Sequence, residues 1–267
     1  MTARSVSARP PKPARSWTVP VGLLAFIAIT WLSLSDEFGI GFDLPDIIED
    51  ATNGFPIIAQ LLDPNWSFLS RTVDPMLETF KMAVIASAIG CTVALPVAFL
   101  ASRVTTPNAV VYALDRGLLS VVRAIPDILY ALVFVAAVSV GALPGILALI
   151  LFNIGVVAKL LSETIDGVDA GPIEAGRAAG ANRMQTVRWS VVPQVLPNYV
   201  AYSLYTFELN IRASTVIGIV GGGGIGNVLN AQLKFFNYGN VSVVILELFV
   251  FVFLIEMISI WLRRRLV

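Results

Sequence analysis

The sequence predicts an all-α membrane protein with six transmembrane helices. Of its 267 residues, 57% are hydrophobic and only 13% are charged, and the mean hydropathy is +0.81. Soluble globular domains are about 45–50% apolar and about 25% charged, so the chain lies outside their range. In addition, six apolar runs approach or exceed the length of about 20 residues that crosses a bilayer core.

The six predicted spans are residues 17–35, 79–101, 124–141, 145–161, 198–220 and 241–262. The third and fourth are short, and they meet at the sequence GALPG, where glycine and proline suit a tight turn between antiparallel helices. A cleaved signal peptide is the alternative for residues 1–35. The long apolar run and the lack of a small-residue cleavage site favour a retained first helix.

The uneven distribution of charge predicts the orientation, because Lys and Arg in connections stay on the cytoplasmic side. Basic residues mark both tails and the connections after the second and fourth spans. They are Arg4, Arg9, Lys12, Arg15, Arg103, Arg116, Arg123, Arg177, Arg183, Arg188, Arg263, Arg264 and Arg265. Residues 36–78 instead carry nine acidic residues against Arg71 alone. We therefore expect a multi-pass protein of the plasma (inner) membrane with both termini in the cytoplasm.

This topology predicts three segments. Residues 1–16 form a basic cytoplasmic tail, and residues 17–78 contain the first helix and an acidic extracytoplasmic segment. Residues 79–265 form the main transmembrane domain, with a cytoplasmic loop at 163–197.

The residue inventory excludes several kinds of chemistry. Histidine is absent and Cys91 is the only cysteine, which excludes disulfide frameworks, Cys/His zinc sites and histidine-based catalysis. The spans contain no convergent pair of Asp residues, so a membrane enzyme has little chemistry to use. No phosphate loop of the form GxxxxGK[ST] occurs. We expect no catalytic residue, no metal and no cofactor in this chain, and no nucleic-acid partner.

A polar stretch, IEAGRAAGANRMQTVRWSVVPQVLP, interrupts the hydrophobic chain at residues 173–197. We expect a short helix that starts at Pro172, has Glu174 in its first turn and ends near Gly180. Asn182 can cap a second short helix, which Pro193 stops. These patterns leave open whether the two helices lie on lipid headgroups or dock a partner protein.

The spacing of this stretch resembles the EAA loop of ABC importer permeases, whose form is Glu-Ala-Ala, three residues, Gly, nine residues, then Ile-x-Leu-Pro. Gly176, Ser190 and Val192 depart from that form by small or apolar exchanges. Together with the stretches 123–137, 171–182 and 205–226, it resembles the permease subunit of phosphonate importers. The resemblance implies a type I importer fold and an ATPase-docking role as coupling helices for Glu174, Ala175, Gly176, Gly180, Ala181, Asn182 and Pro193.

The same resemblance implies the partners and the activity. It implies a second permease subunit, identical or related, two cytoplasmic ATPase subunits that bind ATP and magnesium, and an extracytoplasmic substrate-binding protein. The chain would import phosphonate, phosphate or phosphite by alternating access. A methionine-type or other small-solute importer is the alternative within the family, and an ion-coupled secondary transporter is the alternative outside it.

The fifth span and the glycine run after it supply candidates for the translocation path. Glu208 and Arg212 are four residues apart, in the order that favours an ion pair on one helix, and Asn210 lies between them. The pair is either structural or in contact with a passing anion. The run of Gly221, Gly222, Gly223, Gly224 and Gly226 is either a flexible break at the helix end or a gate whose bare backbone approaches the anion.

Overall fold

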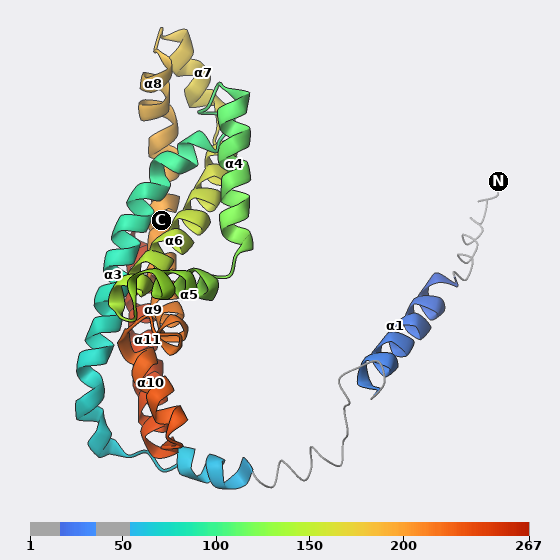
Figure 1. Cartoon of the computed structure of the whole chain (residues 1–267). Helices are drawn as coiled ribbons and strands as arrows, with labels where there is room; N and C mark the ends of the chain where they lie inside the picture. The colour runs from blue at the N-terminus through green and yellow to red at the C-terminus, as the bar shows by residue number, and fades with distance from the viewer. Residues whose placement is uncertain (1–16, 36–53, 267) are drawn as a thin grey trace, which may run out of the picture. The chain divides into compact units, whose positions relative to one another are not determined.

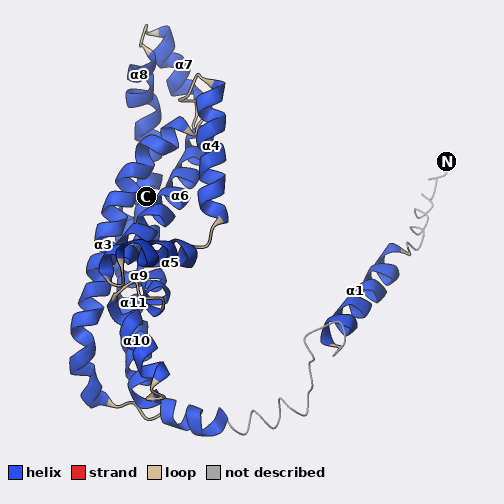
Figure 2. Ribbon diagram, in the orientation of Figure 1, coloured by secondary structure: helices blue, strands red, loops and turns tan. Residues whose placement is uncertain are grey.

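The computed structural model describes residues 17–35 and 54–266, and the fold is given for those residues alone. Every regular element among them is a helix, which confirms the all-α class (Figure 1 and Figure 2). The chain divides into two compact units, Met1–Pro56 and Ile57–Val267. The basic tail predicted at residues 1–16 and much of the predicted acidic segment lie outside the described residues.

The smaller unit contains helix α1 (Thr18–Leu34), which has no buried residue. Two of its hydroxyls are satisfied within the helix, because those of Thr30 and Ser33 donate to the carbonyls of Phe26 and Ile29, each at 2.8 Å. A bilayer core demands such internal hydrogen bonding. The 17 residues of α1 span about 26 Å, slightly less than the hydrocarbon core of about 30 Å.

Three helices of the larger unit are long and apolar enough to cross a membrane, namely Trp66–Leu100, Ala142–Asp166 and Tyr238–Arg264. The first joins a short 3-10 turn, η1 (Trp66–Phe68), to α3 (Leu69–Leu100); the second is α6, and the third makes up most of α11 (Tyr238–Leu266). Two bent helix pairs raise the number of candidate spans to five if each pair is one span. This result supports a multi-pass protein. In addition to these candidates, α1 is a shorter apolar helix.

The third predicted span is wrong as a single helix. Only Ala124 of that span lies in α4 (Ala109–Ala124), and most of the rest forms the short helix α5 (Asp127–Val138). The two helices meet at an angle of 86°. Pro126 explains the break, because proline lacks an amide hydrogen and forces the preceding residue toward extended backbone. Ile125 has that conformation, with a ψ angle of 123°.

No predicted span corresponds to α4. Arg123, predicted to lie in the connection after the second span, belongs to this helix. The charged residues of α4 make its sequence resemble a cytoplasmic connection. The structure instead packs α4 along α6, and the stem of Arg123 lies against Gly155, midway along α6. Arg123 is therefore remote from the end of α6 that leads into the polar stretch.

The helix that follows the polar stretch begins earlier than predicted. Helix α8 (Arg183–Thr186) continues through a π-helical turn, η2 (Val187–Val191), into α9 (Val192–Ile219). The prediction that Pro193 stops a short helix is thus wrong. Pro193 lies in the first turn of α9, a position where the missing amide hydrogen of proline is tolerated. Helix α10 (Gly224–Lys234) follows α9 at a bend of 41°.

Close packing of α3 against α6 forms the centre of the larger unit. Small residues line the buried side of α3, namely Ala83, Ala86, Ser87, Gly90, Cys91, Ala94 and Ala98. A Cβ atom on Gly90 would lie only 2.5 Å from the Cβ atom of Asn153 in α6, and Nδ2 of Asn153 donates to the carbonyl of Ala86 at 3.0 Å. Small residues and buried hydrogen bonds of this kind hold helices together where lipid removes the hydrophobic driving force.

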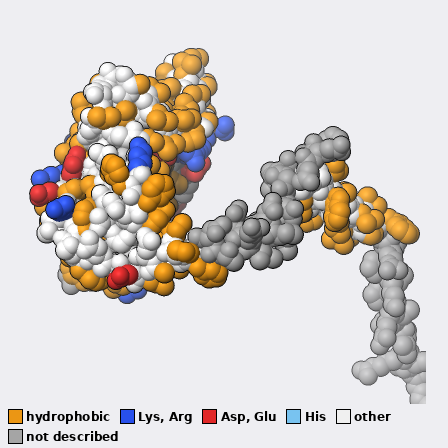
Figure 3. Space-filling model, turned by 60° about the horizontal axis from the view of Figure 1, so that its bottom comes forward, with side chains coloured by type: hydrophobic (Ala, Val, Ile, Leu, Met, Phe, Trp, Pro, Cys, Tyr) orange, Lys and Arg blue, Asp and Glu red, His pale blue; other side chains and the backbone are white. Residues whose placement is uncertain are grey.

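The outward surface of the larger unit is largely apolar. Leu114 is 69% exposed and Phe249 is 67% exposed. In Figure 3, hydrophobic side chains occupy broad areas of the visible face, whereas acidic and basic side chains form small separate groups. A surface of this kind suits lipid or another apolar protein surface. Helices α7 (Ala170–Ala178) and α8 lie at one end of this unit and α10 at the other (Figure 1).

Candidate functional site

The first candidate site is the hairpin formed by α7, α8 and η2, which we call the coupling hairpin (residues 169–191). Helix α7 begins at Ala170, two residues before the predicted start, because the side chain of Asp169 caps it by accepting from the amide of Gly171 at 3.0 Å. Glu174 therefore lies in the second turn, and the prediction that it lies in the first turn is wrong.

The bend between α7 and α8 forms where the sequence predicts it. Gly180 has a φ angle of +82°, a left-handed conformation that favours glycine and ends α7. Asn182 then caps α8 as predicted. Its side chain accepts from the amide of Gln185 at 2.9 Å, and the side chain of Gln185 accepts from the amide of Asn182 at 2.8 Å. This reciprocal pair is a capping box.

Gly176 and Ser190 hold the two arms of the hairpin together. A Cβ atom on Gly176 would lie 3.2 Å from the Oγ atom of Ser190, so the glycine lets η2 approach α7 closely. The Ser190 hydroxyl donates to the carbonyl of Pro172 at 2.9 Å. Both residues depart from the EAA form. In the structure they lie against each other, so the two departures form one contact.

Polar contacts join the start of α8 and the end of α6 to neighbouring segments. Arg183 donates through two nitrogens to the carbonyl of Thr105, at 2.6 and 3.1 Å. Asp166, at the end of α6, accepts from the hydroxyl of Ser102 at 2.6 Å and pairs with Arg116 of α4 at 3.1 Å. A displacement of the hairpin would therefore be transmitted to α3, α4 and α6.

The tip of the hairpin presents a small-residue surface with two large apolar side chains beside it. Glu174, Ala175, Gly180 and Asn182 are exposed, while Gly176 and Ala181 are half-buried. Met184 and Trp189 are 76% and 71% exposed. Pro193 is exposed but lies in α9, outside the hairpin.

The predicted ion pair between Glu208 and Arg212 is confirmed, and the structure extends it to four residues. Glu208 contacts Arg212 with one carboxylate oxygen and Arg263 of α11 with the other, the second at 3.4 Å. Arg212 also lies 3.7 Å from Glu256 of α11. Two arginines and two carboxylates give the network no net charge.

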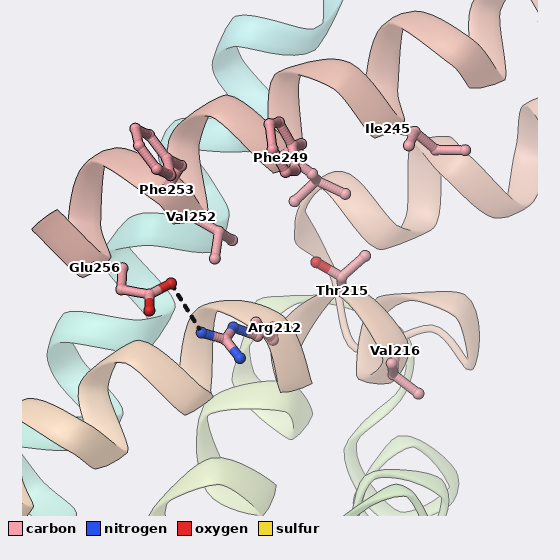
Figure 4. Close-up of a pocket in the computed structure, with 9 residues that line it drawn as sticks. Arg212, Thr215, Val216, Ile245, Phe249, Val252, Phe253 and Glu256 are labelled. Carbon is pink, nitrogen blue, oxygen red and sulfur yellow. Dashed lines mark ion pairs between the residues drawn. The ribbon is translucent and has the colours of Figure 1, made fainter.

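Part of this network faces a cavity between α9 and α11. The cavity has a volume of 460 Å³, and Figure 4 shows Arg212 and Glu256 directed toward each other at its edge. Apolar side chains such as Phe249 and Phe253 form most of the remaining lining. The side chain of Glu208 is only 8% exposed, whereas that of Arg212 is 48% exposed.

Sequence reasoning missed the roles of Glu256 and Arg263. It placed Arg263 in a cytoplasmic tail, but α11 continues to Leu266 and carries this side chain back to α9. The two residues are seven apart, which puts them on one face of a helix two turns apart. That spacing was the available signal, yet only the packing of α11 on α9 shows which acid each arginine meets.

Asn210 does not join this network. It is fully buried, and its Nδ2 atom donates to the Oγ atom of Ser87 at 2.7 Å. The side chain therefore connects α9 to α3, on the opposite side of α9 from α11.

The glycine run forms a buried turn between α9 and α10. Gly221, Gly223 and Gly224 have φ angles of +96°, +82° and +67°. The turn also packs against other helices, since the amide of Gly141 donates to the carbonyl of Gly221 at 2.9 Å. A Cβ atom on Gly226 would overlap the carbonyl oxygen of Thr215.

Packing thus accounts for the glycines of this turn without a ligand. Gly222, Gly223, Gly224 and Gly226 are all buried. The amide of Ile225 donates to the hydroxyl of Thr79 in α3 at 2.8 Å, which ties the start of α10 to α3.

Comparison with known proteins identifies the family. Residues 94–267 match the family described as "Binding-protein-dependent transport system inner membrane component". The chain belongs to this family. It is thus a permease of the inner membrane, and its family is one of transport subunits rather than enzymes.

Two curated relatives show how far the similarity of this permease extends. A phosphite transport system permease protein of Stutzerimonas stutzeri is 41% identical over 223 residues, which cover 81% of each chain. A phosphate-import permease protein of Mycolicibacterium smegmatis is 37% identical over 212 residues, which cover 79% of this chain and 40% of that longer one.

Solved structures support the permease fold. A chain of the MetNI methionine ABC transporter, in an inward-facing conformation, is 26% identical and has a TM-score of 0.66. The alignment covers 73% of this permease and 96% of that chain. The helical arrangement described above is therefore that of an ABC importer permease.

The first prediction concerns the glycine turn. Gly226→Ala should destabilise the permease by about 1–3 kcal/mol, because the added methyl overlaps Thr215. Gly117→Ala is the matched control, since nothing lies within 4 Å of its Cβ position and alanine favours a helix by up to about 1 kcal/mol. Thermal unfolding of both purified variants in detergent checks this, and equal midpoints would contradict the packing role.

The second prediction concerns the buried carboxylate of Glu208. Glu208→Leu leaves Arg263 without its acid; removing one partner of a fully buried pair costs about 3–5 kcal/mol, and because Arg263 is only partly buried, we expect a smaller loss here. Glu247→Leu is the control, because Oε2 of Glu247, in α11, is buried with no hydrogen-bond partner. We expect a lower unfolding midpoint for the first variant only. A similar loss in both would show that the ion pairs add no stability.

Proposed function

We propose that this permease is the membrane subunit of an ATP-driven importer that carries phosphite, phosphonate or phosphate into the cell. The observation that carries the proposal is the 41% identity to a phosphite permease over 81% of the chain. Permeases named for phosphate import and for phosphonate transport are 37% and 40% identical over shorter regions. Anionic phosphorus compounds are the substrate class that these relatives share.

The family description implies a binding protein, and the coupling hairpin supports an ATPase partner. We infer a complex of two permease subunits, identical or related, two cytoplasmic ATPase subunits and an extracytoplasmic binding protein. With six spans, counting α1 as the first and each bent pair as one, both termini lie on the same side of the membrane, and their basic residues favour the cytoplasmic side. The transporter domain then extends over residues 79–265 and follows the type I importer arrangement.

The geometry of the coupling hairpin suits mechanical coupling. Its small-residue tip can enter a cleft of an ATPase subunit. Arg183, just after the tip, binds the carbonyl of Thr105, and α6, which leads into the hairpin, is joined through Asp166 to Ser102 and to Arg116 of α4. Movement of the ATPase subunits would therefore move the helices that enclose the path, which is what alternating access requires. ATP and magnesium are bound by the partner in this mechanism.

The energy of anion uptake supports an ATP-driven mechanism. Each negative charge that moves inward against a negative-inside potential costs about 2.3 kcal/mol per 100 mV. A secondary transporter of such anions would need ion sites at broken helices in two repeated halves. The sequence shows no internal repeat.

We infer a structural role for the pair of Glu208 and Arg212, because Glu208 is buried and bridges α9 to α11. We likewise assign the glycine turn to packing rather than to a gate. A methionine importer remains the second candidate, since the structural match above is to a methionine transporter and a probable D-methionine permease of Vibrio cholerae is 28% identical. Competition between unlabelled methionine and labelled phosphite separates the two substrates.

The third prediction tests the docking role of the hairpin tip. Gly180→Trp should abolish uptake and co-purification with the ATPase subunit, because a bulky side chain at the exposed tip blocks docking. Gly180→Asn is the control for backbone strain, since asparagine tolerates a left-handed conformation and open space surrounds this position. Normal ATPase binding by the tryptophan variant would argue for a hairpin that lies on lipid.

The fourth prediction tests the energy source. Deletion of the ATPase subunit should stop uptake of radiolabelled phosphite, phosphonate and phosphate in cells that keep their proton gradient. A membrane-potential dye verifies that the gradient is intact. Persistent uptake through this permease under those conditions would favour the secondary transporter.

A further inference from the structure

The break between α4 and α5 carries a positive charge to the middle of the larger unit. Arg123 lies in the last turn of α4, immediately before this break. A Cβ atom on Gly155 would lie 3.2 Å from the Cγ atom of Arg123, so the arginine stem crosses α6 at that glycine. Gly155 is 13 residues from the start of α6 and 11 from its end, or about 20 and 17 Å along the axis.

A cavity of 310 Å³ opens at this break. Its polar lining consists of Arg123, Asp127 and Tyr130, and α6 supplies Phe152, Gly155 and Val156. The break is held in shape from within, because the hydroxyl of Tyr130 donates to the carbonyl of Val122 at 2.8 Å. The absence of a side chain at Gly155 leaves room for the arginine to lie across α6.

The guanidinium of Arg123 has no acidic partner in the described part of the chain. The ion pairs within 4 Å there involve Arg116, Lys159, Arg212 and Arg263, but not Arg123. Asp127 lines the same cavity, yet its Oδ1 atom accepts from the amide of Ile128 at 2.9 Å, within the first turn of α5. Arg123 is also exposed rather than packed away.

An unpaired arginine at this depth must face water or an anion. A charged side chain at the bilayer centre costs at least about 2.5–3.5 kcal/mol when it faces lipid. Arg212 avoids this cost by pairing with Glu208 and Glu256. The same pairing neutralises its charge, so Arg212 attracts a passing anion less strongly. Arg123 has no acid paired with it to neutralise its charge. It lies where the break between α4 and α5 leaves a cavity beside α6.

We propose that Arg123 binds the oxygens of the transported phosphorus oxyanion during its passage, at the break between α4 and α5. This inference rests on the proposed function and names the site within the path. Guanidinium matches two oxygens of such an anion with two parallel hydrogen bonds. Asp127 lines the same cavity but does not pair with Arg123, so it weakens the hold on the anion without neutralising the guanidinium, and the anion can leave.

The first arm of the test compares charge variants in the complete transporter, reconstituted with its ATPase and binding protein. Arg123→Gln should reduce uptake of radiolabelled phosphite at least about tenfold, because a hydrogen bond to a charged group is lost at the site of passage. Arg123→Lys should retain part of the uptake. Arg212 is the rival site. Arg212→Gln should lower the unfolding midpoint of the permease, while uptake per folded transporter should change little.

The second arm uses the cysteine content of the chain. Cys91 is the only cysteine and is buried, so Cys91→Ser gives a cysteine-free background. In that background, a cationic methanethiosulfonate should label Arg123→Cys and restore part of the uptake. An anionic reagent of the same family should label the same position without restoring uptake. Leu118→Cys, on the exposed apolar side of α4, should stay unlabelled.

Two results would overturn the inference. Wild-type uptake by Arg123→Gln would show that the anion does not need this charge, and an unreactive Arg123→Cys would show that the position does not face water. Both leave the proposed function intact if the wild-type transporter still imports the anion. If the wild-type transporter imports none of phosphite, phosphonate and phosphate, the proposed function is wrong, and the ligand assigned to Arg123 is wrong with it.

Discussion

The close packing of α3 against α6 is the contact on which the rest of the structure depends. It requires small residues on α3, above all Gly90, which allows Asn153 of α6 to reach the backbone of α3. Once these two helices are in contact, α9 docks beside them through the bond between Asn210 and Ser87. The ends of α3 and α6 then determine where the coupling hairpin and the glycine turn can lie. The positions of the coupling hairpin and of the glycine turn therefore both depend on one helix contact.

The coupling hairpin shows how a short segment can be rigid without a core of its own. Gly176 and Ser190 join its arms, and Arg183, at the start of α8, fixes it to the connection after α3. Because the hairpin continues into α9 through a π-helical turn, no flexible loop separates it from a membrane helix. A force applied to its tip would reach α9 directly, which is the property that an ATP-driven permease needs.

The charges inside the helical unit fall into two groups. Glu208, Arg212, Glu256 and Arg263 neutralise one another between α9 and α11, and this arrangement favours stability over anion binding. Arg123 belongs to the second group, since it occupies a helix break and has no acid within pairing distance. The contrast follows from backbone geometry. A continuous helix can place an acid one turn from an arginine, whereas a proline break removes the turn in which that acid would lie.

The sequence by itself determined the helical class, the hairpin bend at Gly180, the cap at Asn182 and the ion pair of Glu208 with Arg212, because each depends on residues within four positions of one another. It could not show that α4 exists, that Pro193 continues a helix or that Arg123 lies midway along α6. Charged residues in α4 made it resemble a connection, and only its packing on α6 reveals the depth of Arg123. The tertiary structure also decided the partners of Glu208 and the burial of the glycine turn. Those contacts join residues far apart in the chain, and local spacing carries no information about them.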